Sequence, residues 1–287
     1  MISVRLVRRR IRSVQNTQKV TNAMQMISAS KMRRGQARVL ATRPYAEKMR
    51  EVLADLASVP RTESDIHPLL EEREARRIGI VLVTSDRGFC GGFNGNMNRR
   101  AASFILEQTV PTSIIAVGRK GREFMARYRR DLLADFTALG DQPAFLDTLP
   151  ISRIVIDEYT AGNLDRVYLA YTRFQSMAVQ RPVIEQLLPI QPPAGFETRK
   201  RYLDYIYEPN PEAVLAALLP RYVEMLVYHA LLESVASEHS ARMVAMRNAT
   251  DAAEDMVQEL TLIMNKARQE QITKELLELA GGAAALV

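Results

Sequence analysis

The stretch that most constrains the fold runs from Tyr222 to Ala280 and contains neither proline nor glycine. As one helix it would be on the order of 90 Å long, at about 1.5 Å per residue. A typical helix of a globular protein has about 12 residues. A small domain cannot bury a rod of that length, so this segment needs a partner along its axis.

The apolar residues of this stretch indicate a coiled coil. In its second half they follow alternating steps of four and three residues, at Ala253, Val257, Leu260, Met264 and Ala267. After a longer step the pattern resumes and locally changes the supercoil, at Ile272, Leu276, Leu279 and Ala283. Between Met225 and Ala236 apolar residues lie on more than one side, which predicts packing against both a helix and another domain.

The N-terminal segment, from Ser3 to Val59, has a helical pattern as well, with Ser3 as its cap. Its predicted seam has three pieces, the second in a shifted register: Val4, Val7, Ile11 and Val14; Val20, Met24 and Ile27; Tyr45, Met49, Val52 and Leu56. Pro44 is expected to kink or end the helix, because its ring clashes with the preceding turn. The two terminal segments are therefore predicted to pair as an antiparallel coiled coil.

The middle of the chain predicts an α/β domain. Residues 60–76 are polar and form a linker. Strands are expected at 77–84 and 113–117, and helices at 98–108, 121–129 and 146–159, the last interrupted near its start by Pro150. Alternation of this kind indicates a parallel sheet.

The end of this domain predicts an antiparallel hairpin of strands 167–174 and 182–190, with one more edge strand at 202–207. A second helix start follows, with Asn210 as cap and Pro211 as first helical residue. Pro220 is expected to bend that helix. The predicted organisation is an N-terminal coiled-coil helix at 1–59, a linker at 60–76, a central Rossmann-like α/β domain with a mixed sheet at 77–208, and a C-terminal coiled-coil helix at 209–287.

Composition bears on disulfides, membrane-spanning segments, signal peptides and the charge of the partner. A single cysteine, Cys90, allows no internal disulfide. There is no uninterrupted apolar run long enough to span a membrane, and the first thirty residues lack the apolar core of a signal peptide. The net charge is +6, and no acidic residue precedes Glu47 while arginine and lysine are frequent there. This basic N-terminal region could face nucleic acid or an acidic protein, or could be an import peptide, although an import peptide would not share a coiled-coil pattern with the other end of the chain.

The glycine-rich loop from Gly88 to Gly95 is the main candidate for chemistry, because phosphate-binding loops lie between a strand and a helix. It matches neither common nucleotide motif and lacks the lysine that reaches terminal phosphates. A tight turn is the preferred interpretation, and nucleotide binding is the alternative. Cys90 would need a base to act as a nucleophile, and the pattern places neither His67, His229 nor His239 beside it. We predict no catalytic, cofactor-binding or metal-binding residue.

Three motifs resemble the γ subunit family of F-type ATP synthases. They are RRIRSVQNTQKVTNAM from Arg9 to Met24, SDRGFCGGFN from Ser85 to Asn94, and NKARQEQITKEL from Asn265 to Leu276. The resemblance covers essentially the whole chain in the family's order. It implies a central rotor shaft that couples ion-driven rotation of a c ring to ATP synthesis or hydrolysis in other subunits, without a nucleotide, metal or cofactor of its own.

The resemblance also implies partners and contact residues. One copy of the chain would lie inside a hexamer of catalytic and non-catalytic subunits, bind the ε subunit and rest on the c ring, on the cytoplasmic face of a bacterial plasma membrane. Contacts with the catalytic subunits are expected at Met24, Arg33, Arg34, Arg268, Gln269, Thr273 and Glu275. Contacts of the foot with the c ring are expected at Tyr205, Tyr207 and Glu208. The cysteine pair of chloroplast members is absent, and with it their redox switch.

Two other hypotheses remain. The first is an enzyme: a nucleotide-dependent α/β domain with a dimerising coiled coil, which predicts saturable nucleotide binding. The second is a coiled coil that binds nucleic acid through its basic N-terminal face, which predicts retention on DNA or RNA that depends steeply on salt.

Overall fold

A computed structural model describes residues 3–57, 67–191, 208 and 210–284. By their internal contacts the residues form two compact units. One consists of Met1–Ser28 together with Arg242–Val287, and the other is Ala29–Ala241. Two long helices, α1 (Val4–Ala57) and α5 (Pro211–Ala284), contribute to both units.

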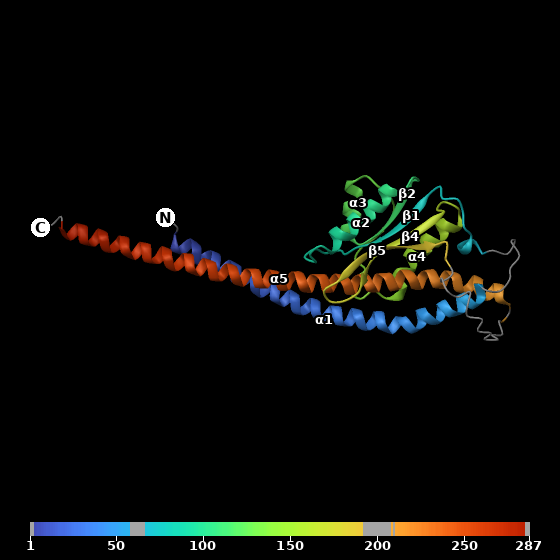
Figure 1. The fold of residues 1–287 in the computed structure, drawn as a ribbon, viewed down its shortest axis with the longest axis horizontal. Helices are drawn as coiled ribbons and strands as arrows, with labels where there is room; N and C mark the ends of the chain where they lie inside the picture. The colour runs from blue at the N-terminus through green and yellow to red at the C-terminus, as the bar shows by residue number, and fades with distance from the viewer. Residues whose placement is uncertain (1–2, 58–66, 192–207, 209, 285–287) are drawn as a thin grey trace. The chain divides into compact units, whose positions relative to one another are not determined.

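The second unit contains a five-stranded mixed sheet in the order β3-β2-β1-β4-β5 (Figure 1). The strands are β1 (Ile78–Val83), β2 (Thr112–Val117), β3 (Asp131–Phe136), β4 (Arg166–Phe174) and β5 (Gln180–Leu188). β1 is parallel to both β2 and β4, β2 is parallel to β3, and β5 is antiparallel to β4 at the edge. The predicted parallel layer and its antiparallel hairpin are confirmed.

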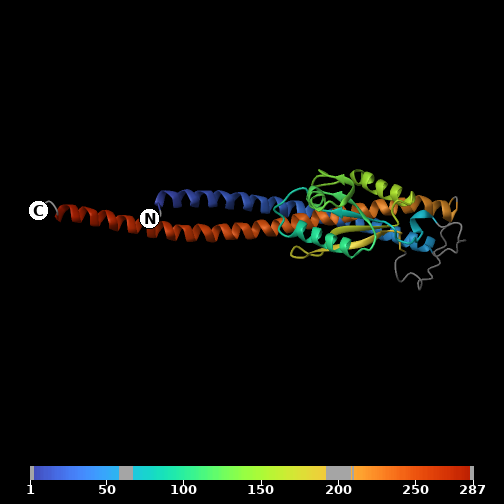
Figure 2. The same ribbon diagram turned by 90° about the horizontal axis from the view of Figure 1, so that it is seen from above.

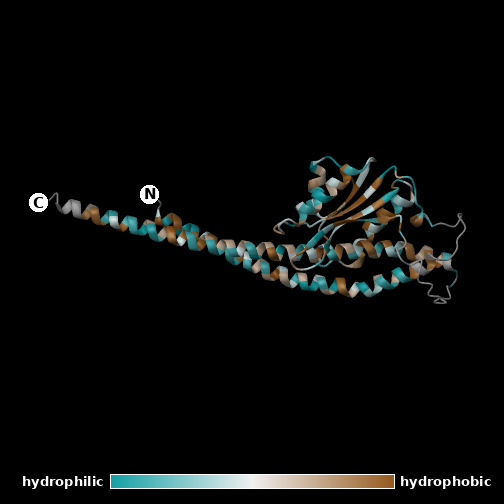
Figure 3. Ribbon diagram, in the orientation of Figure 1, coloured by the Kyte–Doolittle hydropathy of each residue, from teal (hydrophilic) through white to brown (hydrophobic). Residues whose placement is uncertain are grey.

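Strand β1 is the centre of the sheet, and all six of its residues are buried. A strand covered on both faces is expected to be a continuous apolar run rather than an alternating one, as this strand is. Figure 3 shows the same concentration of hydrophobic residues along the strands. The edge strand β3 was absent from the sequence prediction, because its polar residues Asp131 and Asp135 are exposed and leave a short, weakly apolar pattern.

Helices cover both faces of the sheet. On one face α2 (Phe93–Glu107) and α3 (Arg119–Arg127) pack through Met97, Ala101 and Met125 onto alternate residues of β1 and β2. On the other face lie α4 (Phe145–Thr160) and parts of α5 and α1. α2 begins five residues before its predicted start, and α4 continues through Pro150 without interruption. Asp147 supports the start of α4 by accepting a hydrogen bond from the Ala144 amide at 2.7 Å.

The start of α5 agrees with its prediction. The Asn210 side chain accepts a hydrogen bond from the Ala213 amide at 2.8 Å, as an N-cap does, and Pro211 is the first helical residue. The helix continues through Pro220, just as α1 continues through Pro44, so neither proline ends its helix. The edge strand predicted at 202–207 lies outside the described residues.

Among the described helices, α5 is the one that is long and apolar enough, by length and composition, to cross a membrane. This is a weak indication, because the core helix of a soluble protein passes the same test. Most residues from Val227 to Ser240 are buried within the second unit. The apolar character of this part of α5 is explained by the two surfaces that it contacts, the sheet and α1.

Contacts between α5 and the sheet are partly polar. The Ser234 hydroxyl accepts a hydrogen bond from the Thr172 amide at 3.1 Å, and the Ser237 hydroxyl donates to the Thr172 carbonyl at 3.1 Å. On its other side α5 meets α1 closely: a Cβ atom added at Gly35 would lie 3.3 Å from the Cα and Cβ atoms of Ala236. The prediction that this part of α5 packs on two sides is therefore confirmed.

The buried residues of α1 follow one continuous heptad pattern. They alternate in steps of four and three, at Val7, Ile11, Thr21, Ser28, Met32, Gly35, Val39, Ala46, Met49, Leu53 and Leu56, with half-buried residues at most of the missing positions. The predicted shift of register is wrong: Val20 and Ile27 are 59% and 55% exposed, and the small polar residues Thr21 and Ser28 occupy the seam instead. Tyr45 is exposed as well, and Ala46 is buried in its place.

In the first unit, α1 and α5 lie side by side and antiparallel (Figures 1 and 2). The hydroxyl groups of Thr21 and Thr250 form a hydrogen bond of 2.7 Å between the two helices. Ala253 and Ala267 of the predicted seam are buried, and Val257, Leu260 and Met264 are partly buried. The continuation of the seam is exposed at Ile272, Leu276 and Leu279, because α5 extends past the N-terminal end of α1.

Gly118 provides a test of the fold. It has a φ of +97°, and an added Cβ would lie 2.2 Å from the Thr84 carbonyl oxygen. Backbone strain and steric overlap therefore act together in Gly118→Ala. We expect this variant to lower the free energy of unfolding by about 3 kcal/mol or more, measured by urea denaturation followed by circular dichroism.

Gly95→Ala is the matched control, since a Cβ at Gly95 meets nothing within 4 Å and the residue lies inside α2. That change should be neutral or stabilise the chain by about 0.5–1 kcal/mol. Equal stability of the two variants would contradict the packing described here.

Candidate functional site

The carboxyl edge of the sheet is where a nucleotide would be expected in this kind of fold. The glycine-rich loop leaves the end of β1 and enters α2, and Gly118 leads from the end of β2 into α3. A phosphate group at such an edge binds the free amides at a helix N-terminus. The partners of these amides therefore decide whether an anion site is open.

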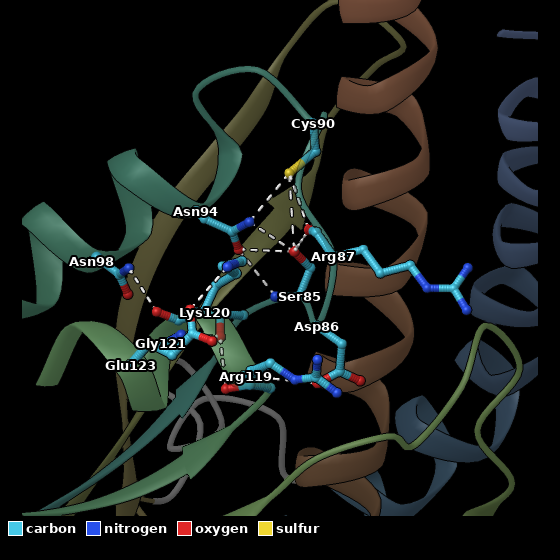
Figure 4. Close-up of polar contacts among 12 residues, drawn as sticks. Ser85, Asp86, Arg87, Cys90, Asn94, Asn98, Arg119, Lys120, Gly121 and Glu123 are labelled. Atoms are coloured by element: carbon cyan, nitrogen blue, oxygen red, sulfur yellow. Dashed lines mark hydrogen bonds and ion pairs between the residues drawn. The ribbon is translucent and has the colours of Figure 1, made fainter. Parts of the chain in front are cut away.

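The first amides of α3 are occupied by groups of the chain itself (Figure 4). The Arg119 amide donates to Oδ1 of Asp86 at 2.9 Å, the Lys120 amide to the Ser85 carbonyl at 3.0 Å, and the Gly121 amide to the Thr84 hydroxyl at 2.8 Å. The Asp86 carboxylate thus takes the position that a phosphate would need at the start of α3. A second anion there would be repelled by it.

The interior of the loop is a compact hydrogen-bonded turn (Figure 4). The Asn94 side chain accepts from the Ser85 amide at 3.0 Å and donates to the Ser85 hydroxyl at 2.7 Å. It also donates to the Cys90 sulfur at 3.2 Å. Cys90 is only 2% exposed. The loop therefore has the closed geometry of a structural turn, as the sequence analysis preferred.

The histidines do not form a site with Cys90. The imidazole of His67 accepts a hydrogen bond from the Leu69 amide at 3.2 Å and caps a short 3-10 helix, and burial lowers its pKa. His229 and His239 lie on α5, and Nε2 of His239 is 3.5 Å from the Asp141 carboxylate. Within the described ranges, no group of three or more His, Cys, Asp or Glu side chains is placed to hold a metal ion.

A cavity of about 610 Å³ opens between β4, β5, α5 and α1 in the second unit. Arg50, Arg173, Glu185, His229 and Glu233 contribute its charged and titratable groups. Arg173 forms an ion pair with Glu185, and the Tyr171 hydroxyl donates to Glu185 at 2.9 Å. Burial raises the pKa of Tyr171 and lowers that of His229. The Arg173–Glu185 ion pair and the Tyr171 hydroxyl thus form one hydrogen-bonded group in the wall of the cavity.

Glu233 of this cavity has one buried carboxylate oxygen without a partner among the described residues. The residue is 7% exposed, and its Oε2 atom has no hydrogen-bond partner within the described part of the chain. Burial raises its pKa, although the Arg173 charge and a hydrogen bond from the Phe174 backbone act in the opposite direction. The folded chain therefore holds a proton at Glu233 more tightly than the unfolded chain does.

The contact residues expected from the resemblance fall into three groups: those on α1 in the second unit, those in the first unit, and those just before α5. Arg33 and Arg34 are exposed on α1 in the second unit. In the first unit Met24 is half-buried, while Arg268, Gln269, Thr273 and Glu275 are exposed along the last turns of α5. Glu208 is exposed, and Tyr205 and Tyr207 lie outside the described residues.

A polar connection between the sheet and the helices, through contacts of Asp86 and Asp141, was not predicted from the sequence. Asp86, Lys31 and Asp141 take part in it, and none of them was a candidate. The signal available in the sequence was the position of Asp86, a carboxylate three residues after the end of a buried strand and just before the glycines of the loop.

Comparison with known proteins gives a consistent result over the full length. A sequence model of the ATP synthase family matches residues 3–286. The ATP synthase gamma chain of Dehalococcoides mccartyi strain CBDB1 is 56% identical to this chain over all of both proteins. That of Roseiflexus castenholzii is 50% identical over all of this chain and 99% of the relative.

Solved structures show the same fold. The central stalk and c-ring structure of the Tetrahymena thermophila mitochondrial ATP synthase contains a chain with a TM-score of 0.61 and 25% identity, matched over 80% of this chain and 99% of that one. A chain in the Euglena gracilis mitochondrial ATP synthase has a TM-score of 0.69 at 22% identity, over 99% of this chain and 94% of that one.

Occupation of the anion position by Asp86 predicts that the chain does not bind ATP. Isothermal titration of the isolated chain with Mg-ATP should give no saturable heat up to about 1 mM nucleotide, a concentration that would reveal a binding free energy near −4 kcal/mol. A saturable curve with one site per chain would contradict this and favour the enzyme hypothesis.

The raised pKa of Glu233 predicts a pH-dependent gain in stability for Glu233→Gln. An unfolded glutamate has a pKa of about 4.3, so the wild-type chain loses stability as pH rises from there through the higher folded pKa. At pH 7.5 the variant should unfold with a free energy higher by on the order of 1 kcal/mol, and the gain should vanish towards pH 4.

Glu254→Gln, a change at an exposed position of α5, is the control and should alter stability little at either pH. A loss of stability in Glu233→Gln at pH 7.5 would show that the buried carboxylate is stabilising rather than strained.

Proposed function

Since the chain belongs to the ATP synthase γ-chain family and forms the central shaft of that complex, we propose that it works as a non-catalytic rotor. Rotation of a c ring turns its central domain, and its helix pairs force the catalytic subunits in turn through states of different nucleotide affinity. The observation that carries this proposal is the pairing of α1 with α5 in each unit, built on a heptad seam that is kept along α1.

Paired helices are suited to transmit torque. An isolated helix is only marginally stable in water, and its stability in a protein comes from packing. Knobs-into-holes packing locks each helix against rotation relative to the other. The coupling itself is a difference in contact free energy between rotor positions, since a conformational drive requires differential binding.

The energy available to such a rotor determines how much free energy the shaft must transmit in each step. A unit charge that crosses the membrane supplies about 2.3 kcal/mol per 100 mV. Several charges must pass for each ATP made. The shaft must therefore transmit several kcal/mol per step without yielding.

The contacts of Asp86 and Cys90 support a non-catalytic role. The anion position at the sheet edge is filled by Asp86, and Cys90 is buried in a closed turn. Catalysis would then belong to other subunits, which we propose to be a hexamer of catalytic and non-catalytic chains around the shaft. The sequence-based division into helix 1–59, linker 60–76, central domain 77–208 and helix 209–287 is part of this proposal.

Most of the proposed contact residues that the structure describes are exposed. Met24, Arg33 and Arg34 on α1, and Arg268, Gln269, Thr273 and Glu275 on α5, would meet the catalytic subunits. Glu208, together with Tyr205 and Tyr207, would face the c ring, and the ε subunit would bind the central domain. In a bacterium this places the chain at the cytoplasmic face of the plasma membrane.

A double charge reversal tests the contact at α1. In Arg33→Glu/Arg34→Glu two exposed cations that would guide acidic segments of the catalytic subunits become anions, and like charges repel. We expect ATP-driven proton pumping per ATP hydrolysed to fall at least about threefold, which corresponds to about 0.65 kcal/mol at RT ≈ 0.59 kcal/mol.

The measurement uses membrane vesicles with the assembled complex and compares acidification with ATP hydrolysis. Arg99→Glu/Arg100→Glu is the matched control, an adjacent exposed pair on α2. Unchanged pumping per ATP in the α1 variant, or an equal loss in the control, would refute the role of Arg33 and Arg34.

A further inference from the structure

Two carboxylates, Asp86 and Asp141, connect the loop 137–144 to different parts of the second unit. Asp86 follows β1 and belongs to the glycine-rich motif. Asp141 lies in the loop itself, between β3 and α4. Both residues, and all the groups that they contact, belong to the unit Ala29–Ala241.

Asp86 fastens the loop to the sheet. Its Oδ1 accepts from the Arg119 amide and its Oδ2 from the Ala138 amide, each at 2.9 Å. One carboxylate thus joins the end of β1, the start of α3 and the loop after β3. Ala138 has a φ of +62°, a conformation that is strained for a residue with a Cβ atom. The hydrogen bond from its amide to Asp86 helps to hold this conformation.

Asp141 fastens the same loop to α1 and lies close to α5. Its Oδ2 lies 2.5 Å from Nζ of Lys31 on α1, and its Oδ1 lies 3.5 Å from Nε2 of His239 on α5. Burial raises the pKa of Asp141, but the hydrogen bond and charge of Lys31 outweigh it and the net shift is downward. The carboxyl group is therefore ionised at neutral pH, as the contact with Lys31 requires.

A second contact attaches the loop to α1 at another residue. Arg38 donates from Nη2 to Oε1 of Gln142 at 2.6 Å. Lys31 and Arg38 are seven residues apart and so lie two turns apart on the same side of α1. Close by, Gly35 allows α1 to approach α5 at Ala236. The loop thus contacts α1 beside the place where Gly35 lets α1 approach α5 closely.

The directional nature of these contacts gives them a mechanical role. The hydrophobic effect between the sheet and the helices is itself non-directional. Charge-assisted hydrogen bonds have fixed geometry and are stronger than neutral ones. A helix pair held to a sheet by both kinds of contact keeps one rotational angle relative to that sheet.

We propose that Asp86 and Asp141 are positioning residues that pass torque from the central domain to the helix pair, with the loop 137–144 as the brace between them. This inference rests on the rotor function and adds its internal transmission path. Asp86, Ala138, Asp141 and Lys31 form that path, from the end of β1 to α1. The glycine-rich motif thereby has a mechanical use that does not involve a ligand.

The test uses the assembled complex in membrane vesicles and two readouts, ATP hydrolysis and ATP-driven proton pumping. Asp141→Asn and Lys31→Gln each remove one charge of the pair with little change in volume. Each should leave ATP hydrolysis within about twofold of wild type and lower pumping per ATP at least about threefold. Asp86→Asn, which keeps one acceptor oxygen, should lower pumping per ATP as well.

A double variant distinguishes the loss of one contact between Asp141 and Lys31 from general damage to the fold. Because Asp141 and Lys31 act through one contact, Asp141→Asn/Lys31→Gln should lose no more pumping per ATP than either single change. Asp135→Asn is the control, since Asp135 pairs with Arg122 at 3.1 Å on the surface of the sheet edge. It should pump as the wild type does.

The outcomes that overturn the brace are distinct from those that overturn the rotor. Unchanged pumping per ATP in the Asp141 and Lys31 variants, an additive loss in the double variant, or an equal loss in Asp135→Asn would refute the brace. The rotor function is tested separately, with vesicles whose complex lacks this chain. If they pump as well as wild type, the rotor function itself fails.

Discussion

The structure depends on one stretch of α5, from Val227 to Ser240, that must satisfy two different surfaces at once. One side contacts the sheet, through buried apolar residues and through serine hydroxyls that bond to the backbone of β4. The other side contacts α1, where Gly35 lets the two backbones approach. A helix buried on both sides cannot be amphipathic in the usual sense, and most residues of this stretch are buried whether they are apolar or polar.

Small residues decide how the helices meet. Thr21, Ser28 and Gly35 occupy seam positions of α1 where a leucine would be expected in an ordinary coiled coil. Small side chains bring the two axes together, and the Thr21–Thr250 hydrogen bond adds a directional contact between them. The pair is therefore held by close approach and by polar contacts, rather than by a wide apolar seam alone.

Much of the fold could be predicted, and the errors have physical causes. The strand β1 and the cap at Asn210 were predictable, because a buried apolar run and an Asn-Pro helix start have strong local signals. The register of α1 was not: Val20 and Ile27 are apolar but exposed, while the seam uses polar residues that pattern analysis discounts. The partners of Asp86 and Asp141 depend on tertiary contacts between distant parts of the chain, so no local pattern reveals them.

The unbroken seven-residue period of α1 has a consequence for chain length. Each added or removed residue turns the rest of a helix by about 100°, which would move every later seam residue of α1 off the face that meets α5. A change of seven residues returns the face almost to its former direction and alters only the length. Variation in the length of this helix should therefore occur in whole heptads, matched by an equal change in α5.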